Sequence, residues 1–290
     1  SIQLTENITI PLDAAGTDAN LDCILTSLTL GGNSSSGTSI AYTWSSPDAT
    51  MPALDSTATL DISAPGTYVL EVLDESNGCF AVDTVLVTQD IEQPTATVAL
   101  PPQLTCTDSL SLLDGSASMG TSVLVYSWTT MNGSLVGSPS AAQVNAGQAG
   151  TYQLVVTNTI NGCTDTTTTT VTQDDNFPQA NIAMPLTLTC GRLSVNLAGT
   201  ANSNSGNTSF TWTTANGNIV QDANTLQPLV DSPGTYTLTV EDNNNNCRAQ
   251  AEIQVLLDNT PPIVDAGLDT LLNCTRTQLQ LSGTADAQGA

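Results

Sequence analysis

Residues 233–247 carry the sequence PGTYTLTVEDNNNNC, and this stretch decides the fold class. After the Pro-Gly pair, apolar side chains recur at every second position as Tyr236, Leu238 and Val240, with threonines between them. Alternation with a period of two is typical of a β-strand that buries one face. The asparagines that follow tolerate the positive φ of a tight turn, so we expect a hairpin before Cys247.

The same stretch occurs three times at a spacing of 84 residues. Tyr68, Tyr152 and Tyr236 each follow a Gly-Thr pair, and a tryptophan precedes each tyrosine by 24 residues. The cysteines keep the same register, with alternating gaps of 56 or 57 residues and of 27 residues. They are Cys23, Cys79, Cys106, Cys163, Cys190, Cys247 and Cys274. A period of 83 or 84 residues is too long for one coil of a solenoid and fits a small β-sandwich.

We therefore predict an all-β chain of tandem immunoglobulin-like β-sandwich domains of about 84 residues, arranged as beads on a string. The predicted limits are residues 1–10 (end of a preceding repeat), 11–93, 94–177 and 178–261 (three complete repeats), and 262–290 (start of a fourth). The tryptophans share a strand face with Tyr42, Tyr126 or Phe210, so we expect them in the sandwich cores and not as sugar-stacking platforms. The predicted core aromatic residues are Trp44, Trp128, Trp212, Tyr68, Tyr152 and Tyr236.

The amino-acid composition argues against most kinds of enzymatic chemistry. The chain has no histidine, its three basic residues are all arginines, and its formal net charge is −24. It therefore lacks the commonest general base and the lysine of Schiff-base or phosphate chemistry, so we expect no enzymatic activity and no cofactor. The negative charge repels nucleic acid, and no apolar run is long enough to span a membrane.

The repeated pattern W-T-T-x-x-G, then P-G-T-Y-x-L-x-V, then N-G-C resembles the PKD-like and SprB-type immunoglobulin-like repeats of large Bacteroidota surface proteins. The likeness covers the three complete repeats and the partial fourth. It implies an extracellular stalk, adhesin or filament at the cell surface. Further copies of the repeat in a longer chain are the partners it implies, and exposed β-edges allow assembly into fibres.

Periodic cysteines in a chain without histidine predict disulfides in an oxidising compartment. Within one repeat the two cysteines lie at opposite poles, separated by a strand of about 20 Å, whereas a disulfide needs Cα atoms within about 7 Å. We therefore favour bridges between repeats, Cys23–Cys163 and Cys106–Cys247, with Cys79, Cys190 and Cys274 pairing outside residues 1–290. Bridges within repeats stay open as the alternative, because the chain-entropy gain of about 4–5 kcal/mol is similar for both schemes. The alternative pairs are Cys23–Cys79, Cys106–Cys163 and Cys190–Cys247.

Acidic residues collect near the repeat junctions, at Glu6, Asp90, Glu92, Asp174, Asp175 and Asp258. Junction carboxylates can bind Ca²⁺ and stiffen an array. Their spacing differs between junctions, which favours a simpler interpretation as polar linkers in an acidic chain. The overall prediction is a disulfide-stiffened structural repeat region of a secreted or cell-surface bacterial protein. The alternative is an adhesin that recognises glycans or host proteins through loops at one pole.

Overall fold

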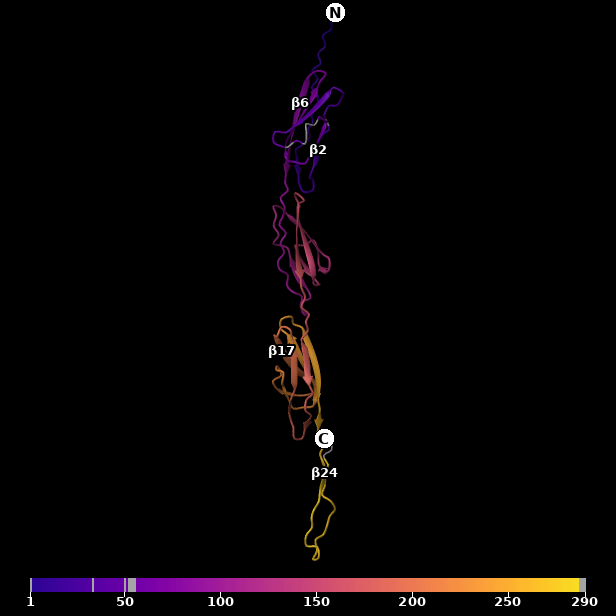
Figure 1. Ribbon diagram of the computed structural model, residues 1–290, viewed down its shortest axis with the longest axis vertical. Coiled ribbons are helices and arrows are strands. Elements are labelled where there is room, and N and C mark those ends of the chain that lie inside the picture. Colours follow the sequence, from indigo (N-terminus) through magenta and orange to yellow (C-terminus); the bar gives the residue numbers. More distant parts are fainter. Residues whose placement is uncertain (1, 33, 50, 52–55, 287–290) are drawn as a thin grey trace. The chain divides into compact units, whose positions relative to one another are not determined.

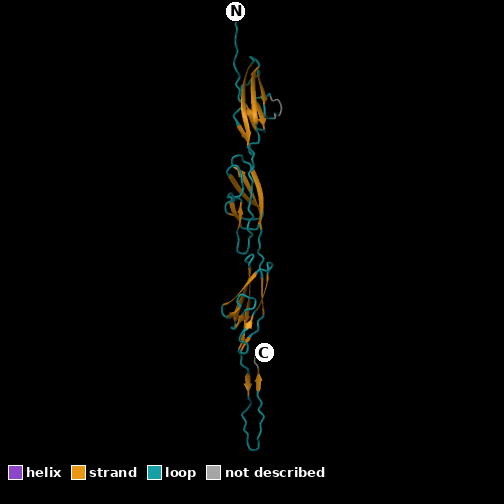
Figure 2. Ribbon diagram, turned by 90° about the vertical axis from the view of Figure 1, so that its left-hand side faces the viewer, coloured by secondary structure: helices purple, strands orange, loops and turns teal. Residues whose placement is uncertain are grey.

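The computed structural model describes residues 2–32, 34–49, 51 and 56–286, and every regular element in these ranges is a β-strand (Figures 1 and 2). The chain divides into two compact units. Unit 1 contains Ser1–Pro102 and Leu110–Thr172, and unit 2 contains Gln103–Ser109 and Gln173–Ala290. The short segment Gln103–Ser109 thus belongs to unit 2, although strands of unit 1 precede and follow it in the sequence.

The first half of unit 1 is a two-sheet sandwich. One sheet has the order β1 (Ala19–Leu21), β6 (Cys79–Gln89), β5 (Gly66–Asp74) and β3 (Ile40–Ser45), and the second pairs β2 (Leu28–Gly31) with β4 (Thr59–Ile62). Both sheets contribute to one buried cluster, in which Leu30 and Leu60 from the small sheet meet Trp44 and Leu70 from the large one. The inward residues alternate along β5, as the sequence pattern predicted.

The second half of unit 1 repeats this plan. One sheet has the order β7 (Ser111–Asp114), β10 (Gln143–Ala146) and β9 (Leu135–Val136), and the other has the order β12 (Thr164–Val171), β11 (Gly150–Asn158) and β8 (Leu124–Thr130). Leu113 and Val144 from the first sheet and Leu154 and Val156 from the second are all buried.

Unit 2 contains a third sandwich. Its sheets are β15 (Val195–Asn196), β19 (Leu229–Val230) and β18 (Ile219–Gln221), and β17 (Thr208–Thr214), β20 (Gly234–Asp242) and β21 (Arg248–Val255). Three strand pairs complete the unit: β13 (Gln179–Ala183) with β16 (Ala198–Asn202), β14 (Leu188–Thr189) with β22 (Leu257–Asp258), and β23 (Ile263–Asp265) with β24 (Thr284–Asp286). Val195, Leu197 and Val230 pack with Trp212 and Leu238 in one buried cluster.

The predicted aromatic residues fill these cores. Each tryptophan is at most 3 % exposed, and its indole N–H donates to a main-chain carbonyl 13 residues later. Each tyrosine is at most 1 % exposed. Its hydroxyl donates to the carbonyl oxygen four residues earlier, at 2.8 Å for Tyr68 and 2.6 Å for Tyr152 and Tyr236. This backward bond is the tyrosine corner of immunoglobulin-like sandwiches, so the chain is a tandem of immunoglobulin-like domains.

Candidate functional site: two disulfide joints

The first site begins at a corner next to β1. This strand runs parallel to the end of β6, so that Leu21 lies beside Gln89, and the Asp90 N–H donates to the Leu21 carbonyl at 2.9 Å. A turn follows in which the Asp22 carboxylate accepts the backbone N–H groups of the residues two and three positions later. These contacts hold Cys23 beside the segment that leaves the first sandwich after β6.

The partner of this corner is the hairpin between β11 and β12. Gly162 adopts φ 66°, and the N–H of Asn158 donates to the Cys163 carbonyl at 2.9 Å, which closes the turn. The Asn161 side chain is fully buried, and its Oδ1 accepts the Cys163 N–H at 3.0 Å. These hydrogen bonds define the turn that presents Cys163 and the Asn161 amide group.

Corner and hairpin meet in what we call joint 1, formed by Cys23, Asp90, Glu92, Asn161 and Cys163. Cys23 and Cys163 form a disulfide with Cα atoms 5.0 Å apart, and the Cys23 N–H donates to the Asn161 carbonyl at 3.1 Å. The Asn161 Nδ2 donates to Asp90 Oδ1 at 2.8 Å and to the Glu92 carbonyl at 2.9 Å. One buried amide thus clamps the segment that connects the first two sandwiches.

Unit 2 contains the same arrangement, joint 2, formed by Cys106, Asp174, Asn176, Asn245 and Cys247. The Cys106–Cys247 disulfide has a Cα separation of 5.1 Å, and the Cys106 N–H donates to the Asn245 carbonyl at 3.3 Å. The Asn245 Nδ2 donates to Asp174 Oδ1 at 3.1 Å and to the Asn176 carbonyl at 3.0 Å. This disulfide explains why Gln103–Ser109 belongs to unit 2.

The electrostatics of joint 2 favour the ionised aspartate. The hydrogen bond from the Asn245 side chain, followed by bonds from the N–H and side chain of Asn176, lowers the pKa of Asp174. The hydrogen bond from the Thr260 N–H likewise lowers the pKa of Asp258, the equivalent residue at the end of the third sandwich. At neutral pH these carboxylates are therefore acceptors for amide donors.

The structure pairs the cysteines between repeats, as Cys23–Cys163 and Cys106–Cys247, while Cys79, Cys190 and Cys274 are free thiols. None of the alternative pairs within a repeat, Cys23–Cys79, Cys106–Cys163 or Cys190–Cys247, is formed. The strand register gives the physical reason. β1 lies beside the last three residues of β6, whereas Cys79 is its first residue. Ten residues of strand span about 33 Å, far beyond the reach of a disulfide.

Two junction carboxylates belong to these joints, and a third lies at the equivalent place at the end of the third sandwich. Asp90 and Asp174 accept the asparagine amides, and Asp258 accepts a backbone N–H. Within the described ranges, no group of three or more His, Cys, Asp or Glu side chains is placed to bind a metal ion. The carboxylates of Asp90 and Asp174 thus serve as hydrogen-bond acceptors within the joints.

The clamping asparagines were not identified from the sequence as anything more than turn residues. A signal was present, because all three hairpins have the pattern Asn-x-Cys, at Asn77, Asn161 and Asn245. An aspartate or asparagine also recurs where each repeat ends, at Asn7, Asp90, Asp174 and Asp258. The two patterns lie about 71 residues apart, so only the folded chain reveals that they are hydrogen-bonded.

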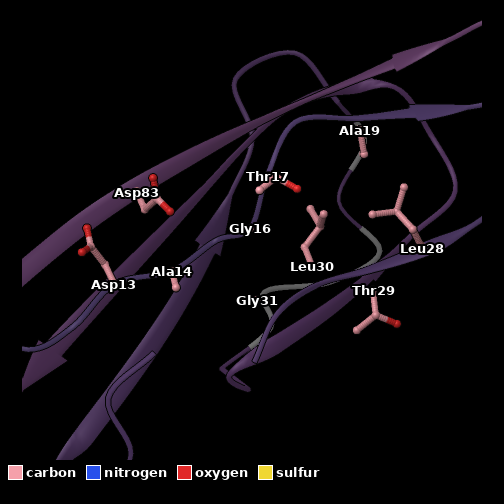
Figure 3. Close-up of a pocket in the computed structure, with 10 residues that line it drawn as sticks. All are labelled: Asp13, Ala14, Gly16, Thr17, Ala19, Leu28, Thr29, Leu30, Gly31 and Asp83. Carbon is pink, nitrogen blue, oxygen red and sulfur yellow. The ribbon is translucent and has the colours of Figure 1, made fainter. Parts of the chain in front are cut away.

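A cavity of about 560 Å³ lies between the segment around Gly16 and strand β2 (Figure 3). Asp13 and Asp83 lie at one end of it and Leu28 at the other. Both carboxylate oxygens of Asp83 accept backbone N–H groups, from Ala15 and Thr84, each at 2.8 Å. This carboxylate therefore holds the segment around Ala15, which precedes β1, beside β6.

In the part of the chain that the structure describes, no helix has the length and apolarity required to cross a membrane. No protein-family model matches the chain, and no curated protein matches it. Among solved structures, a three-domain I-band fragment of titin matches with a TM-score of 0.41 and 13% identity, over 86% of this chain and 99% of the fragment.

Two further fragments with several immunoglobulin domains show the same likeness. Immunoglobulin domains 1–5 of Sidekick-1 match with a TM-score of 0.34 and 14% identity, over 86% of this chain and 59% of that fragment. The N-terminal eight immunoglobulin domains of Down Syndrome Cell Adhesion Molecule match with a TM-score of 0.38 and 15% identity, over 86% of this chain and 36% of theirs. This likeness concerns the immunoglobulin-like fold alone.

Proposed function

We propose that this chain is a non-enzymatic, tension-bearing segment of an extracellular tandem array, in which disulfide joints carry force past most of the strands. The observation that supports this proposal is the interleaving of the two bridges. Cys106 lies inside the loop closed by Cys23–Cys163, and Cys163 lies inside the loop closed by Cys106–Cys247. Bridges of this kind in a chain exported to an oxidising compartment persist and are not reduced.

Interleaving shortens the covalent path along which tension travels. From Ser1 the path reaches Cys23, crosses to Cys163, runs back to Cys106, crosses to Cys247 and continues to Ala290. It contains only about 125 of the 290 residues. At ~3.4 Å per residue the oxidised chain stretches to roughly 420 Å, whereas a chain without disulfides reaches roughly 990 Å. Most strands are thereby shielded from end-to-end force.

The remaining features fit a surface structure. The resemblance of the repeats to those of large Bacteroidota surface proteins supports a stalk or filament. In a longer array of such repeats, further disulfides between repeats would extend the same covalent path. A formal charge of −24 keeps neighbouring arrays apart and disfavours contact with nucleic acid. The missing histidine and lysine, together with the engaged carboxylate of Asp83, support a role without catalysis.

Single-molecule pulling from the two ends tests the proposal. The oxidised chain should stop extending at about 125 residues of contour length, and the fully reduced chain at about 290. Paired cysteine-to-serine replacement at either joint should give about 150 residues, because one bridge then remains. Equal contour lengths before and after reduction would refute the proposed force path, since the bridges would then carry no tension.

A further inference from the structure

The hairpin of joint 1 carries an asparagine–glycine pair, Asn161-Gly162, at the centre of its hydrogen-bonded contact. An asparagine that precedes glycine is especially prone to deamidation, because no side chain on the glycine hinders the approach of its nitrogen to the asparagine Cγ. The hairpin of joint 2 has Asn246 in place of the glycine. The two joints therefore differ in chemical reactivity as well as in the contacts of this residue.

In the closed joint, both reacting groups of the pair are engaged. The Gly162 N–H, whose nitrogen is the nucleophile in deamidation, donates to the Asn158 carbonyl at 2.9 Å. The Asn161 Nδ2, which is the leaving group, donates to Asp90 and to the Glu92 carbonyl, and the side chain is fully buried. Ring closure needs a base to remove the Gly162 proton, so the closed joint protects this N–H from deamidation as it does from hydrogen exchange.

The disulfide of joint 1 maintains this protection. Cys163 directly follows Gly162, and the Cys23 N–H donates to the carbonyl of Asn161 itself at 3.1 Å. The Asn161 amide is otherwise held by hydrogen bonds to residues 69 and 71 positions earlier in the chain. Without the bridge, hydrogen bonds alone hold the hairpin against that segment, so the joint opens more often.

The second sandwich also contains an asparagine–glycine pair outside the joint, Asn132-Gly133. Asn132 is exposed, and its Oδ1 accepts the Thr151 N–H at 2.9 Å, whereas its Nδ2 has no hydrogen-bond partner among the described residues. Asp48 accepts the equivalent N–H in the first sandwich, so an aspartate is compatible with this turn. Asn132 is therefore an internal reference for a reaction that does not depend on the joint.

We propose that Asn161 is a latent deamidation site, which reacts once joint 1 has opened and then prevents the joint from closing again. The Gly162 nitrogen attacks Asn161 Cγ, the Cγ–Nδ2 bond breaks, and the Gly162 proton leaves with the Nδ2 amino group as ammonia. Water then opens the succinimide, at Cγ to give aspartate or at the main-chain carbonyl to give isoaspartate. One water molecule is consumed and one ammonia is released, and no group is oxidised or reduced.

Either product disables the joint. Aspartate has an oxygen in place of the Nδ2 donor, and this oxygen faces the Asp90 carboxylate, so two like charges repel. Isoaspartate lengthens the main chain by one carbon beside Cys163 and displaces the cysteine from its partner. In joint 2, the side chain of Asn246 hinders ring closure, so this joint can open and close again. In a tension-bearing segment, lengthening at joint 1 is then permanent, and only this consequence rests on the proposed function.

The experiment compares three forms of the full chain: the oxidised chain, a variant with both cysteines of joint 1 replaced by serine, and a matched variant with both cysteines of joint 2 replaced. Each is incubated at mildly alkaline pH, and peptide mapping by mass spectrometry follows aspartate and isoaspartate formation. Loss of the joint 1 bridge should accelerate deamidation at Asn161 about tenfold or more and leave Asn132 unchanged. Loss of the joint 2 bridge should leave Asn161 unchanged. In that variant Asn245 should react about tenfold more slowly than Asn161 does in the first variant.

A second measurement needs no cysteine replacement. The unmodified chain is reduced, held for increasing times and reoxidised in glutathione redox buffer. Recovery of the joint 1 disulfide should fall in proportion to deamidation at Asn161, whereas recovery of the joint 2 disulfide should stay complete. Gly162→Ala combined with Ile24→Ala keeps the asparagine amide but slows ring closure, so this variant should recover the joint 1 disulfide after the same delay.

Equal deamidation rates at Asn161 with and without the joint 1 bridge would overturn the proposal. An equal acceleration at Asn132 would do so too, because the effect would then not belong to the joint. Full recovery of the bridge in chains already deamidated at Asn161 would show that the change is not permanent, and would also overturn it. The pulling experiment tests the force path separately, since its contour lengths depend on the two disulfides and not on the state of Asn161.

Discussion

The two joints agree in four parts and differ in one. Each has a disulfide, a bond from the corner cysteine N–H to the hairpin asparagine carbonyl, and two bonds from the asparagine amide to an aspartate and a main-chain carbonyl. They differ at the residue between the asparagine and the cysteine. Gly162 lies against Ile24, whereas the Asn246 side chain donates to Thr107 Oγ1 at 3.3 Å. The hydrogen bonds of the asparagine amide are thus the same in both joints, whereas the residue after the asparagine differs, and so does the side chain that it contacts.

The largest expected effect is the loss of a disulfide. Replacing both cysteines of one joint with alanine should lower the free energy of unfolding by about 5 kcal/mol, because each bridge closes a loop of about 140 residues in the unfolded chain. The loss should be equal at the two joints, and denaturant titration measures it. Cys190→Ala is the matched control and should change stability by less than about 0.5 kcal/mol. Clearly unequal losses would mean that the joints are not equivalent.

The hydrogen bonds of the two asparagine amides are tested by Asn161→Asp and Asn245→Asp. The substitution keeps the acceptor for the cysteine N–H but places a carboxylate oxygen against Asp90 or Asp174. We expect a loss of about 2–4 kcal/mol at each joint, from thermal unfolding at pH 7, since two donors are replaced by an acceptor.

A matched control for the clamp exists in the chain. Asn132 and Asn216 accept the N–H of Thr151 and Thr235 through Oδ1, and in the first sandwich Asp48 does the same for Thr67. Asn132→Asp should therefore be almost neutral, because an aspartate already fills the equivalent place. If Asn161→Asp proved as mild as this control, the asparagine amide would not be what holds the joint.

A smaller loss of stability is expected from changing Gly162, the residue between the asparagine and the cysteine of joint 1. Gly162→Ala introduces a Cβ at φ 66° and within 2.4 Å of the Ile24 side chain. We expect a loss of about 1–2 kcal/mol, of which the backbone part is about 1 kcal/mol. Adding Ile24→Ala should recover the steric part only, as measured by a double-mutant cycle. In joint 2, Asn246→Gly should be tolerated, because φ there is already 57°.

The smallest effect is the response of joint 2 to acid. Because the pKa of Asp174 is lowered in the folded chain, its contribution is complete above the usual aspartate pKa of ~3.9 and is lost as the pH falls below that value. Hydrogen exchange of the Cys106 N–H, which bonds to Asn245, should show extra opening in acid. Asp174→Asn should remove this pH dependence, and an unchanged profile in that variant would assign the opening to another group.

Much of the fold could be predicted from short-range patterns. The alternation along Gly234–Asp242 predicted a half-buried strand, and the structure has one with every second residue buried. The asparagines before Cys247 predicted a turn with positive φ, and Asn246 has it, as do Gly78 and Gly162 in the other two hairpins. Burial of Trp44, Trp128 and Trp212 followed from their shared strand face. These features depend on neighbours within one repeat, whose side chains alternate by backbone geometry alone.

The site was predicted less completely. The distance between the poles of one repeat favoured Cys23–Cys163 over Cys23–Cys79, but it could not exclude the second without the β1–β6 register. The roles of Asn161 and Asn245 were missed, since each bonds to an aspartate 71 residues earlier in the chain. A turn asparagine and a linker aspartate are common separately, and nothing local shows that they meet.

The sequence by itself determined the period, the strand alternation and the aromatic cores, because these follow from backbone geometry and hydrophobic burial over a few residues. Tertiary structure alone decided which hairpin meets which corner, and that Gln103–Ser109 belongs to unit 2. The physical reason is that a disulfide and a buried amide each need specific atoms a few ångströms apart, and here those atoms lie about 70 to 140 residues apart in the sequence.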